Sequence, residues 1–114
     1  MFAQATLIRV PVGAMPQLRR LIMVEYLPVV QAREGFVSAQ FLEQIDDPDT
    51  ALLIIYWESQ QVVEAFHRTG MLQASIQMLA AVQPGIRVER EGYLVTIDTD
   101  DEVKDLPYAA AGQL

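Results

Sequence analysis

The most apolar run of the chain, Ala51 to Trp57, is the feature that most limits the fold. It is bounded by an acidic turn, Asp46 to Asp49, and by Ser59. A short continuous apolar run between turn residues is typical of a strand that is buried on both faces. We therefore expect a central strand that ends at Trp57, followed by a helix that Ser59 caps.

Three further segments alternate in hydropathy, as strands do. They are Phe2 to Val10, Phe36 to Gln44 and Ile86 to Asp98. In the first segment, the even-numbered residues from Gln4 to Val10 share one face. In the last segment the apolar residues change face near Gly92, and this change predicts a β-bulge there.

Two segments, Pro16 to Glu34 and about Gln60 to Val82, carry apolar residues at helical spacing. Pro28 lies inside the first one and has no N–H to donate to the preceding turn. We therefore expect a kink or a break in that turn. Gly35 and Gly70 are placed to end helices in the left-handed conformation.

The resulting order is β-α-β-β-α-β, which is typical of an α+β, ferredoxin-like sandwich with an antiparallel sheet. In this topology the first and third strands are the central pair. We expect residues 1–98 to form this domain and residues 99–114 to form a C-terminal tail. The helices cover one sheet face, and an apolar patch that includes Val37, Phe41, Val95 and Ile97 would lie on the other. Because monomers seldom expose such a patch, we expect a homodimer.

Composition excludes several classes of function. The net charge of −7 disfavours nucleic acid as a partner, since that affinity comes from Lys and Arg. The chain has no Cys and one His, so no metal site is expected. No apolar run is long enough to span a membrane, and we expect a cytoplasmic protein. Without a Gly-rich phosphate loop, no nucleotide or flavin cofactor is expected either.

Several short motifs resemble a known family. They are Glu34-Gly35-Phe36-Val37-Ser38, Leu53 to Tyr56 followed by Trp57-Glu58-Ser59, and Glu64-Ala65-Phe66-His67. Together they resemble the antibiotic biosynthesis monooxygenase family of dimeric α/β barrels, over roughly Phe2 to Ile97. The resemblance implies a homodimer with a small-molecule pocket in each subunit, between the sheet and the helices. It also implies an oxygenase of phenols or quinols that needs no cofactor.

The resemblance also implies candidate catalytic residues, Trp57 and His67. Trp57 matches the pocket Trp of the polyketide-tailoring oxygenases of the family. His67 lies one place beyond Phe66, where related members often carry a His. It would act as the base that takes a phenolic proton if its side chain points inward. The ordinary alternatives are packing for Trp57 and a solvated or core position for His67.

Six further residues are candidates for contact with the substrate. In the resemblance, Leu53 stands where the oxygenases have an Asn. Ile76 stands where the haem-degrading members have the axial His, so haem degradation is disfavoured. Hydrogen bonds to a ligand would come from Gln4, Thr6 or Tyr26. The full set is Gln4, Thr6, Tyr26, Leu53, Phe66 and Ile76.

The leading hypothesis is thus a cofactor-independent monooxygenase that acts on a small hydrophobic aromatic, a phenol or a quinol. One alternative is a non-catalytic module of the same fold that binds a small ligand or dimerises. Another is an isomerase or lyase, since the fold also hosts those activities.

Overall fold

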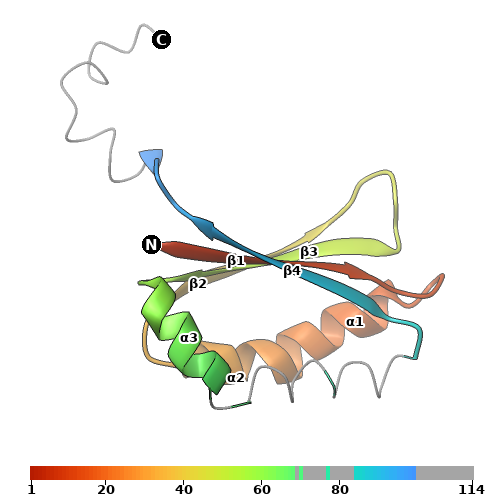
Figure 1. The fold of residues 1–114 in the computed structure, drawn as a ribbon. Helices are drawn as coiled ribbons and strands as arrows, with labels where there is room; N and C mark the ends of the chain where they lie inside the picture. The colour runs from red at the N-terminus through yellow and green to blue at the C-terminus, as the bar shows by residue number, and fades with distance from the viewer. Residues whose placement is uncertain (69, 71–76, 78–83, 100–114) are drawn as a thin grey trace, which may run out of the picture.

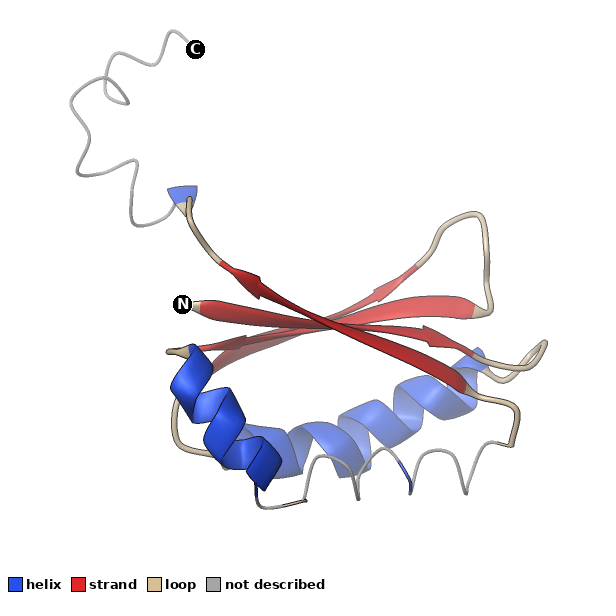
Figure 2. Cartoon of the chain, viewed as in Figure 1, coloured by secondary structure: helices blue, strands red, loops and turns tan. Residues whose placement is uncertain are grey.

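A four-stranded antiparallel sheet with helices on one face makes up the part of the chain that the computed structural model describes, residues 1–68, 70, 77 and 84–99. The helices all lie beneath the sheet, and the opposite sheet face is bare (Figure 1). Figure 2 shows the same two layers coloured by secondary structure. The elements in chain order are β1 (Phe2–Arg9), α1 (Met15–Leu21), η1 (Ile22–Tyr26), α2 (Leu27–Gln31), β2 (Phe36–Glu43), β3 (Thr50–Trp57), α3 (Gln60–Arg68) and β4 (Arg87–Leu94). This architecture confirms the predicted fold class.

The strand order is β2-β3-β1-β4, so β1 and β3 are the central pair, as predicted. Their register runs from Phe2 opposite Trp57 to Arg9 opposite Thr50. Side chains alternate between the faces of a sheet, so the even-numbered residues of β1 face the helices together with the odd-numbered residues of β3.

The core lies between the sheet and the helices. On β3, the helix-facing residues Ala51, Leu53, Ile55 and Trp57 are buried, whereas Leu52, Ile54 and Tyr56 on the other face are only partly buried. The apolar run therefore has one fully buried face in the single chain, and not two as the sequence predicted. Its second apolar face belongs to the bare side of the sheet.

The first helical segment does not break at Pro28. Its hydrogen-bond pattern changes just before this residue. The π-helix η1 precedes it, and the N–H of Leu27 donates to the carbonyl oxygen of Ile22, five residues back. Ile22, Tyr26 and Val30 are buried at a spacing of four residues. On a regular α-helix that spacing drifts by about 40° at each step. The wider π turn offsets this drift and keeps Tyr26 over the sheet.

The β-bulge lies in β2 and not at Gly92. The register shifts between Phe36 and Ser38, whereas β4 pairs with β1 without interruption from Leu94 opposite Phe2 to Arg87 opposite Arg9. The apolar pattern of β4 changes face because both faces of this sheet carry apolar residues. Val88 points toward the helices, and Tyr93 lies on the bare face.

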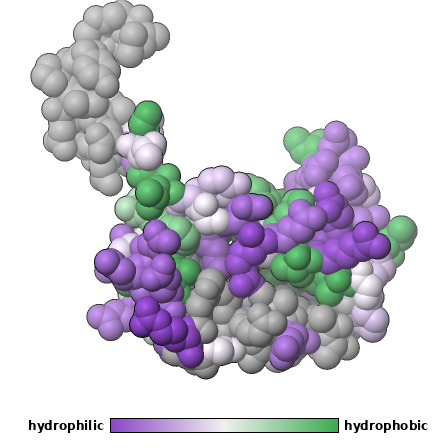
Figure 3. Space-filling view, in the orientation of Figure 1, coloured by the Kyte–Doolittle hydropathy of each residue, from purple (hydrophilic) through white to green (hydrophobic). Residues whose placement is uncertain are grey.

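The bare face carries exposed apolar side chains. Val37 and Tyr93 are 47% and 55% exposed, and beyond β4 Ile97 is 79% exposed. Figure 3 shows hydrophobic side chains gathered near the end of β4. The prediction placed Phe41 on this face and was wrong there. Phe41 lies opposite Leu53 and packs against the core, because the bulge in β2 moves the residues after it to the other face.

The junctions around α3 follow the sequence signals. The N–H of Val62 donates to the Ser59 hydroxyl at 3.3 Å, which confirms Ser59 as the helix cap. Gly35 and Gly70 adopt positive φ angles of 86° and 74°, as expected for glycines that end helices. The carbonyl oxygen of Gly35 accepts a hydrogen bond of 2.8 Å from the N–H of Glu58, which fixes the start of β2 beside the end of β3.

Candidate functional site

Two buried polar side chains interrupt the apolar layer between sheet and helices. Gln4 and Thr6 are on β1, and both face the helices because they share the parity of Ile8. Apolar residues are the usual occupants of such inward positions, and buried polar side chains carry a cost unless they find partners. Their position therefore marks the β1 end of a candidate ligand site.

Arg90 brings a positive charge to the same layer. It lies on β4 directly opposite Thr6, so its side chain shares the helix-facing side of the sheet. The side chain is partly buried, and burial lowers the pKa of its guanidinium while the interaction with Tyr26 opposes this effect. The Nε atom of Arg90 is buried and has no hydrogen-bond partner among the described residues.

Tyr26 faces this cluster from the helix layer. It is held there by η1 and is buried. Burial raises the pKa of the Tyr26 hydroxyl to about 12, and the positive charge of Arg90 partly counters the rise. Tyr26 therefore stays protonated at neutral pH and can donate a hydrogen bond, but it cannot act as an anionic partner for Arg90.

A cavity of about 210 Å³ lies at this edge of the sheet–helix layer. Gln4 and Arg90 contribute polar groups to its wall, and Phe2 and Val63 contribute apolar ones. Glu91 and Gly92 also line it. Gly92 makes room for the Phe2 ring, since a Cβ atom at position 92 would lie 2.6 Å from Cζ of Phe2. Apolar walls with a few converging polar groups are the usual composition of a small-molecule site.

Trp57 occupies the centre of an aromatic cluster. It is 0% exposed, and its ring lies 6.0 Å from Phe36 and 5.6 Å from Phe66, centroid to centroid. Arg33 stacks on the Phe66 ring at 5.0 Å. The indole Nε1 is buried without a hydrogen-bond partner in the described part of the chain. This geometry gives Trp57 a packing role and leaves its N–H available for a ligand that reaches it.

The remaining predicted site residues are distributed around the same layer. Leu53 is buried opposite Thr6, in the wall behind the polar cluster. Phe66 lines a separate hollow of about 160 Å³ with Arg33, Glu34, Val62 and Ala65. The side chain of His67, which belongs to α3, and all of Ile76 lie outside the described residues. Of the five proposed substrate contacts that the structure describes, Gln4 is the one that lines the Arg90 cavity.

Sequence reasoning did not select Arg90. The signal was present, because Ile86, Val88 and Arg90 share one parity and the first two are apolar. An arginine at the next position of this parity predicts a charged side chain on the same face of the sheet as the two apolar ones.

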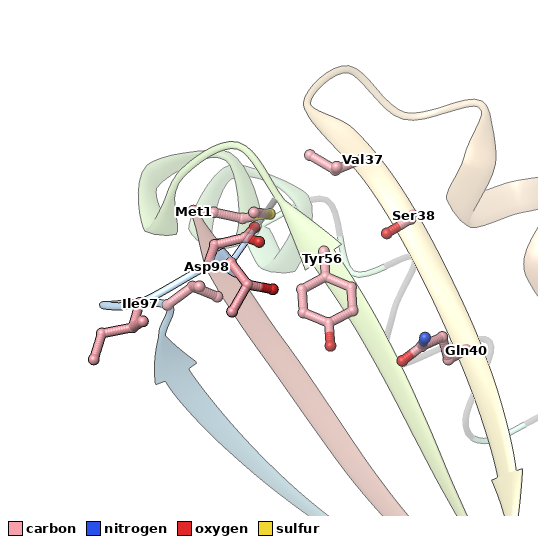
Figure 4. Close-up of a pocket in the computed structure, with 9 residues that line it drawn as sticks. Met1, Val37, Ser38, Gln40, Tyr56, Ile97 and Asp98 are labelled. Carbon is pink, nitrogen blue, oxygen red and sulfur yellow. The ribbon is translucent and has the colours of Figure 1, made fainter. Parts of the chain in front are cut away.

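A larger hollow of about 560 Å³ lies on the bare sheet face. Figure 4 shows the ring of Tyr56 and the side chain of Gln40 beside it, with Ile97 and Asp98 across the opening. None of the predicted site residues line it. It belongs to the face that the helices leave uncovered.

Two further classes of site were sought in the described part of the chain. It holds no group of three or more His, Cys, Asp or Glu side chains arranged to bind a metal ion. Among the described helices, none is long and apolar enough to cross a membrane.

Three solved structures illustrate the likeness of this fold to known proteins. The cofactor-independent oxygenase SnoaB from Streptomyces nogalater aligns with a TM-score of 0.70 at 13% identity, covering 85% of this chain and 94% of its own. The monooxygenase from the gene ActVA-Orf6 of Streptomyces coelicolor, in complex with Nanaomycin D, aligns with a TM-score of 0.64 at 17% identity, covering 85% and 90%. A mutant of MhuD with two manganese protoporphyrin IX molecules bound per active site aligns with a TM-score of 0.68 at 21% identity, covering 86% and 97%.

At these identities the structural likeness establishes the fold. No curated protein matches this chain. The family model described as antibiotic biosynthesis monooxygenase matches residues 1–78, more than half of the 114 residues. The chain belongs to the antibiotic biosynthesis monooxygenase family.

Proposed function

We propose that this protein is a cofactor-independent monooxygenase that acts on a small hydrophobic aromatic, a phenol or a quinol. The observation that carries the proposal is the cavity beside Gln4 and Arg90, which sets polar donors into apolar walls. Such chemistry needs a site that excludes water, a base that makes an electron-rich phenolate and donors that stabilise developing negative charge. Gln4 and Arg90 supply donors at this site.

The substrate itself can supply the electrons. A quinol and O₂ together give a hydroxylated quinone and water, so one oxygen atom enters the ring and the other leaves as water. All four electrons that reduce O₂ come from the quinol. The protein's task is then to bind the ring, remove a proton and hold the resulting anion.

Oxygen uptake with a panel of quinols and phenols tests the proposal. We expect uptake that depends on the protein, and with ¹⁸O₂ we expect one labelled oxygen atom in the product. Binding of these compounds without any uptake would favour the non-catalytic ligand-binding module. The complete enclosure of Trp57 by Phe36 and Phe66 favours that alternative, since a packing tryptophan is no evidence of chemistry.

His67 is proposed as the base, because it is the one histidine of the chain and it follows Phe66 of α3, whose ring packs on Trp57. Replacing His67 with alanine should lower oxygen uptake by about 100-fold, the usual scale for a general base. The exposed Gln61 of the same helix provides the control, and Gln61→Ala should leave uptake unchanged. Equal rates in wild type and His67→Ala would remove His67 from the mechanism.

We also propose that the protein works as a homodimer joined through the bare sheet face. Val37, Leu42 and Tyr93 are exposed there, and Leu52 and Ile54 are only partly buried. A two-fold symmetric pairing would cover the same patch on both subunits. It would also enclose the hollow beside Tyr56.

A further inference from the structure

The charge of Arg90 has no partner of opposite sign within the described structure. Arg90 takes part in neither of the ion pairs that join Arg9 to Glu89 and Arg19 to Glu43. Its electrostatic partner is the hydroxyl of Tyr26, which is neutral at physiological pH. A partly buried cation with no counter-ion among the described residues loses part of its hydration, so its presence at a cavity calls for an explanation.

Among the described residues, no carboxylate forms an ion pair with Arg90. Glu89 and Glu91 flank Arg90 along β4, and their side chains alternate to the bare face, where Glu89 pairs with Arg9. Glu91 also borders the cavity, yet no ion pair joins it to Arg90 in the described structure. A bound anion would supply the counter-charge that the described residues do not.

The shape of the cavity limits what that anion can be. Its volume of about 210 Å³ lies below the range of about 300–1,000 Å³ that holds drug-sized ligands. Phe2 and Val63 provide apolar walls that suit one flat ring, and the Phe2 ring itself packs into the space that Gly92 leaves. The guanidinium matches the planar geometry of a carboxylate, and it also pairs with a phenolate oxygen.

We propose that Arg90 anchors the anionic oxygen of a small aromatic ligand in the cavity between β1, β4 and α3. The inference rests on the proposed function in one respect, that this cavity is where the substrate binds. It adds the ligand class, a monoanionic aromatic whose charge is a carboxylate or a phenolate. The neutral hydroxyl of Tyr26 interacts with the charge of Arg90 from the helix layer.

Calorimetric binding of 4-hydroxybenzoate and 4-hydroxybenzamide tests the charge preference, since the two probes differ little in shape. Wild-type protein should bind the acid about 10- to 100-fold more tightly than the amide, the usual worth of a hydrogen bond to a charged group. Arg90→Gln should abolish the preference, and Arg90→Lys should restore part of it. Arg87→Gln, on the same strand and exposed, should leave the preference intact.

The phenolate form is tested with 4-nitrophenol, whose anion absorbs visible light. Binding to wild-type protein should lower the apparent pKa of the probe, so that the yellow form appears at a lower pH than in buffer. Arg90→Gln should remove that shift. A preference seen with 4-hydroxybenzoate alone identifies a carboxylate ligand, and a shift seen with 4-nitrophenol identifies a phenolate ligand.

Several results would overturn the proposal that Arg90 anchors the ligand. These are equal affinities for acid and amide in the wild type together with no 4-nitrophenol shift, a preference that survives in Arg90→Gln, or no binding of any probe. The proposed function fails separately, when quinols bind and no oxygen is consumed. Because these measurements need no turnover, a failed anchor and an absent monooxygenase activity give different results.

Discussion

Gly35→Ala is expected to lower the free energy of unfolding by about 2–5 kcal/mol. The residue has a φ angle of 86°, a conformation that costs an L-amino acid about 1–2 kcal/mol. A Cβ atom there would also lie 2.4 Å from Cγ1 of Val62, and overpacking of this kind costs about 1–3 kcal/mol. Denaturant unfolding followed by circular dichroism measures the loss.

Gly13 offers a matched control for this substitution. Its φ angle is 81°, and nothing lies within 4 Å of a Cβ atom built on it. Gly13→Ala should therefore show the backbone cost alone, about 1–2 kcal/mol. The second change Val62→Ala should recover part of the loss in Gly35→Ala, because it removes the clashing methyl groups. If Gly13→Ala and Gly35→Ala lost the same stability, close packing against Val62 would not matter.

The fold was predictable because local signals and the global arrangement agree. Ser59 has the side chain that a helix cap needs, and it caps α3. Gly35 tolerates the left-handed conformation, and it adopts it. The apolar run up to Trp57 required a central strand, and β3 is central. Each of these features depends on a few neighbouring residues, which one sequence is enough to show.

The candidate site was less predictable, because it is assembled from distant parts of the chain. Arg90 meets Thr6 through strand pairing and Tyr26 through helix packing, and no spacing in the sequence records either contact. Gln4 was predicted as a hydrogen-bonding group for a ligand, together with Thr6 and Tyr26, and its side chain lines the cavity. Trp57 was chosen from a family pattern, and the structure surrounds it with aromatic rings. Family position alone did not reveal how its ring packs.

The bulge predicted at Gly92 shows a second limit of predicting structure from the spacing of apolar residues. A change of apolar parity along a strand has two physical causes, an inserted residue or a sheet with two apolar faces. Only the second applies to β4, whose pairing with β1 is regular. The open face of this sheet is apolar enough to produce the pattern, and this apolar character is what the dimer proposal rests on.

Ile54→Asp is expected to convert the proposed homodimer to a monomer, raising the dissociation constant by about 1,000-fold or more. Ile54 lies on the bare face of the central strand β3, opposite Ala5 of β1 and Gln40 of β2. Pairing of two copies would bury an uncompensated carboxylate in each subunit, at a cost of several kcal/mol apiece. The single chain should still fold, because Ile54 is only partly buried within it. Light scattering and analytical ultracentrifugation measure the change from twice the chain mass of 12.8 kDa to that mass itself.

Met23→Asp is the matched control, since it adds the same charge at a residue of η1 that is 64% exposed on the helix side. It should leave the mass unchanged, which separates the loss of the sheet interface from a general effect of negative charge on a chain that already carries −7. Circular dichroism should show equal secondary structure in both variants. A dimer that persists in Ile54→Asp at micromolar concentration would place the subunit interface elsewhere, and a monomeric wild type would refute the dimer itself. In either case the exposed apolar residues of this face would need another partner, because a monomer seldom leaves such a patch uncovered.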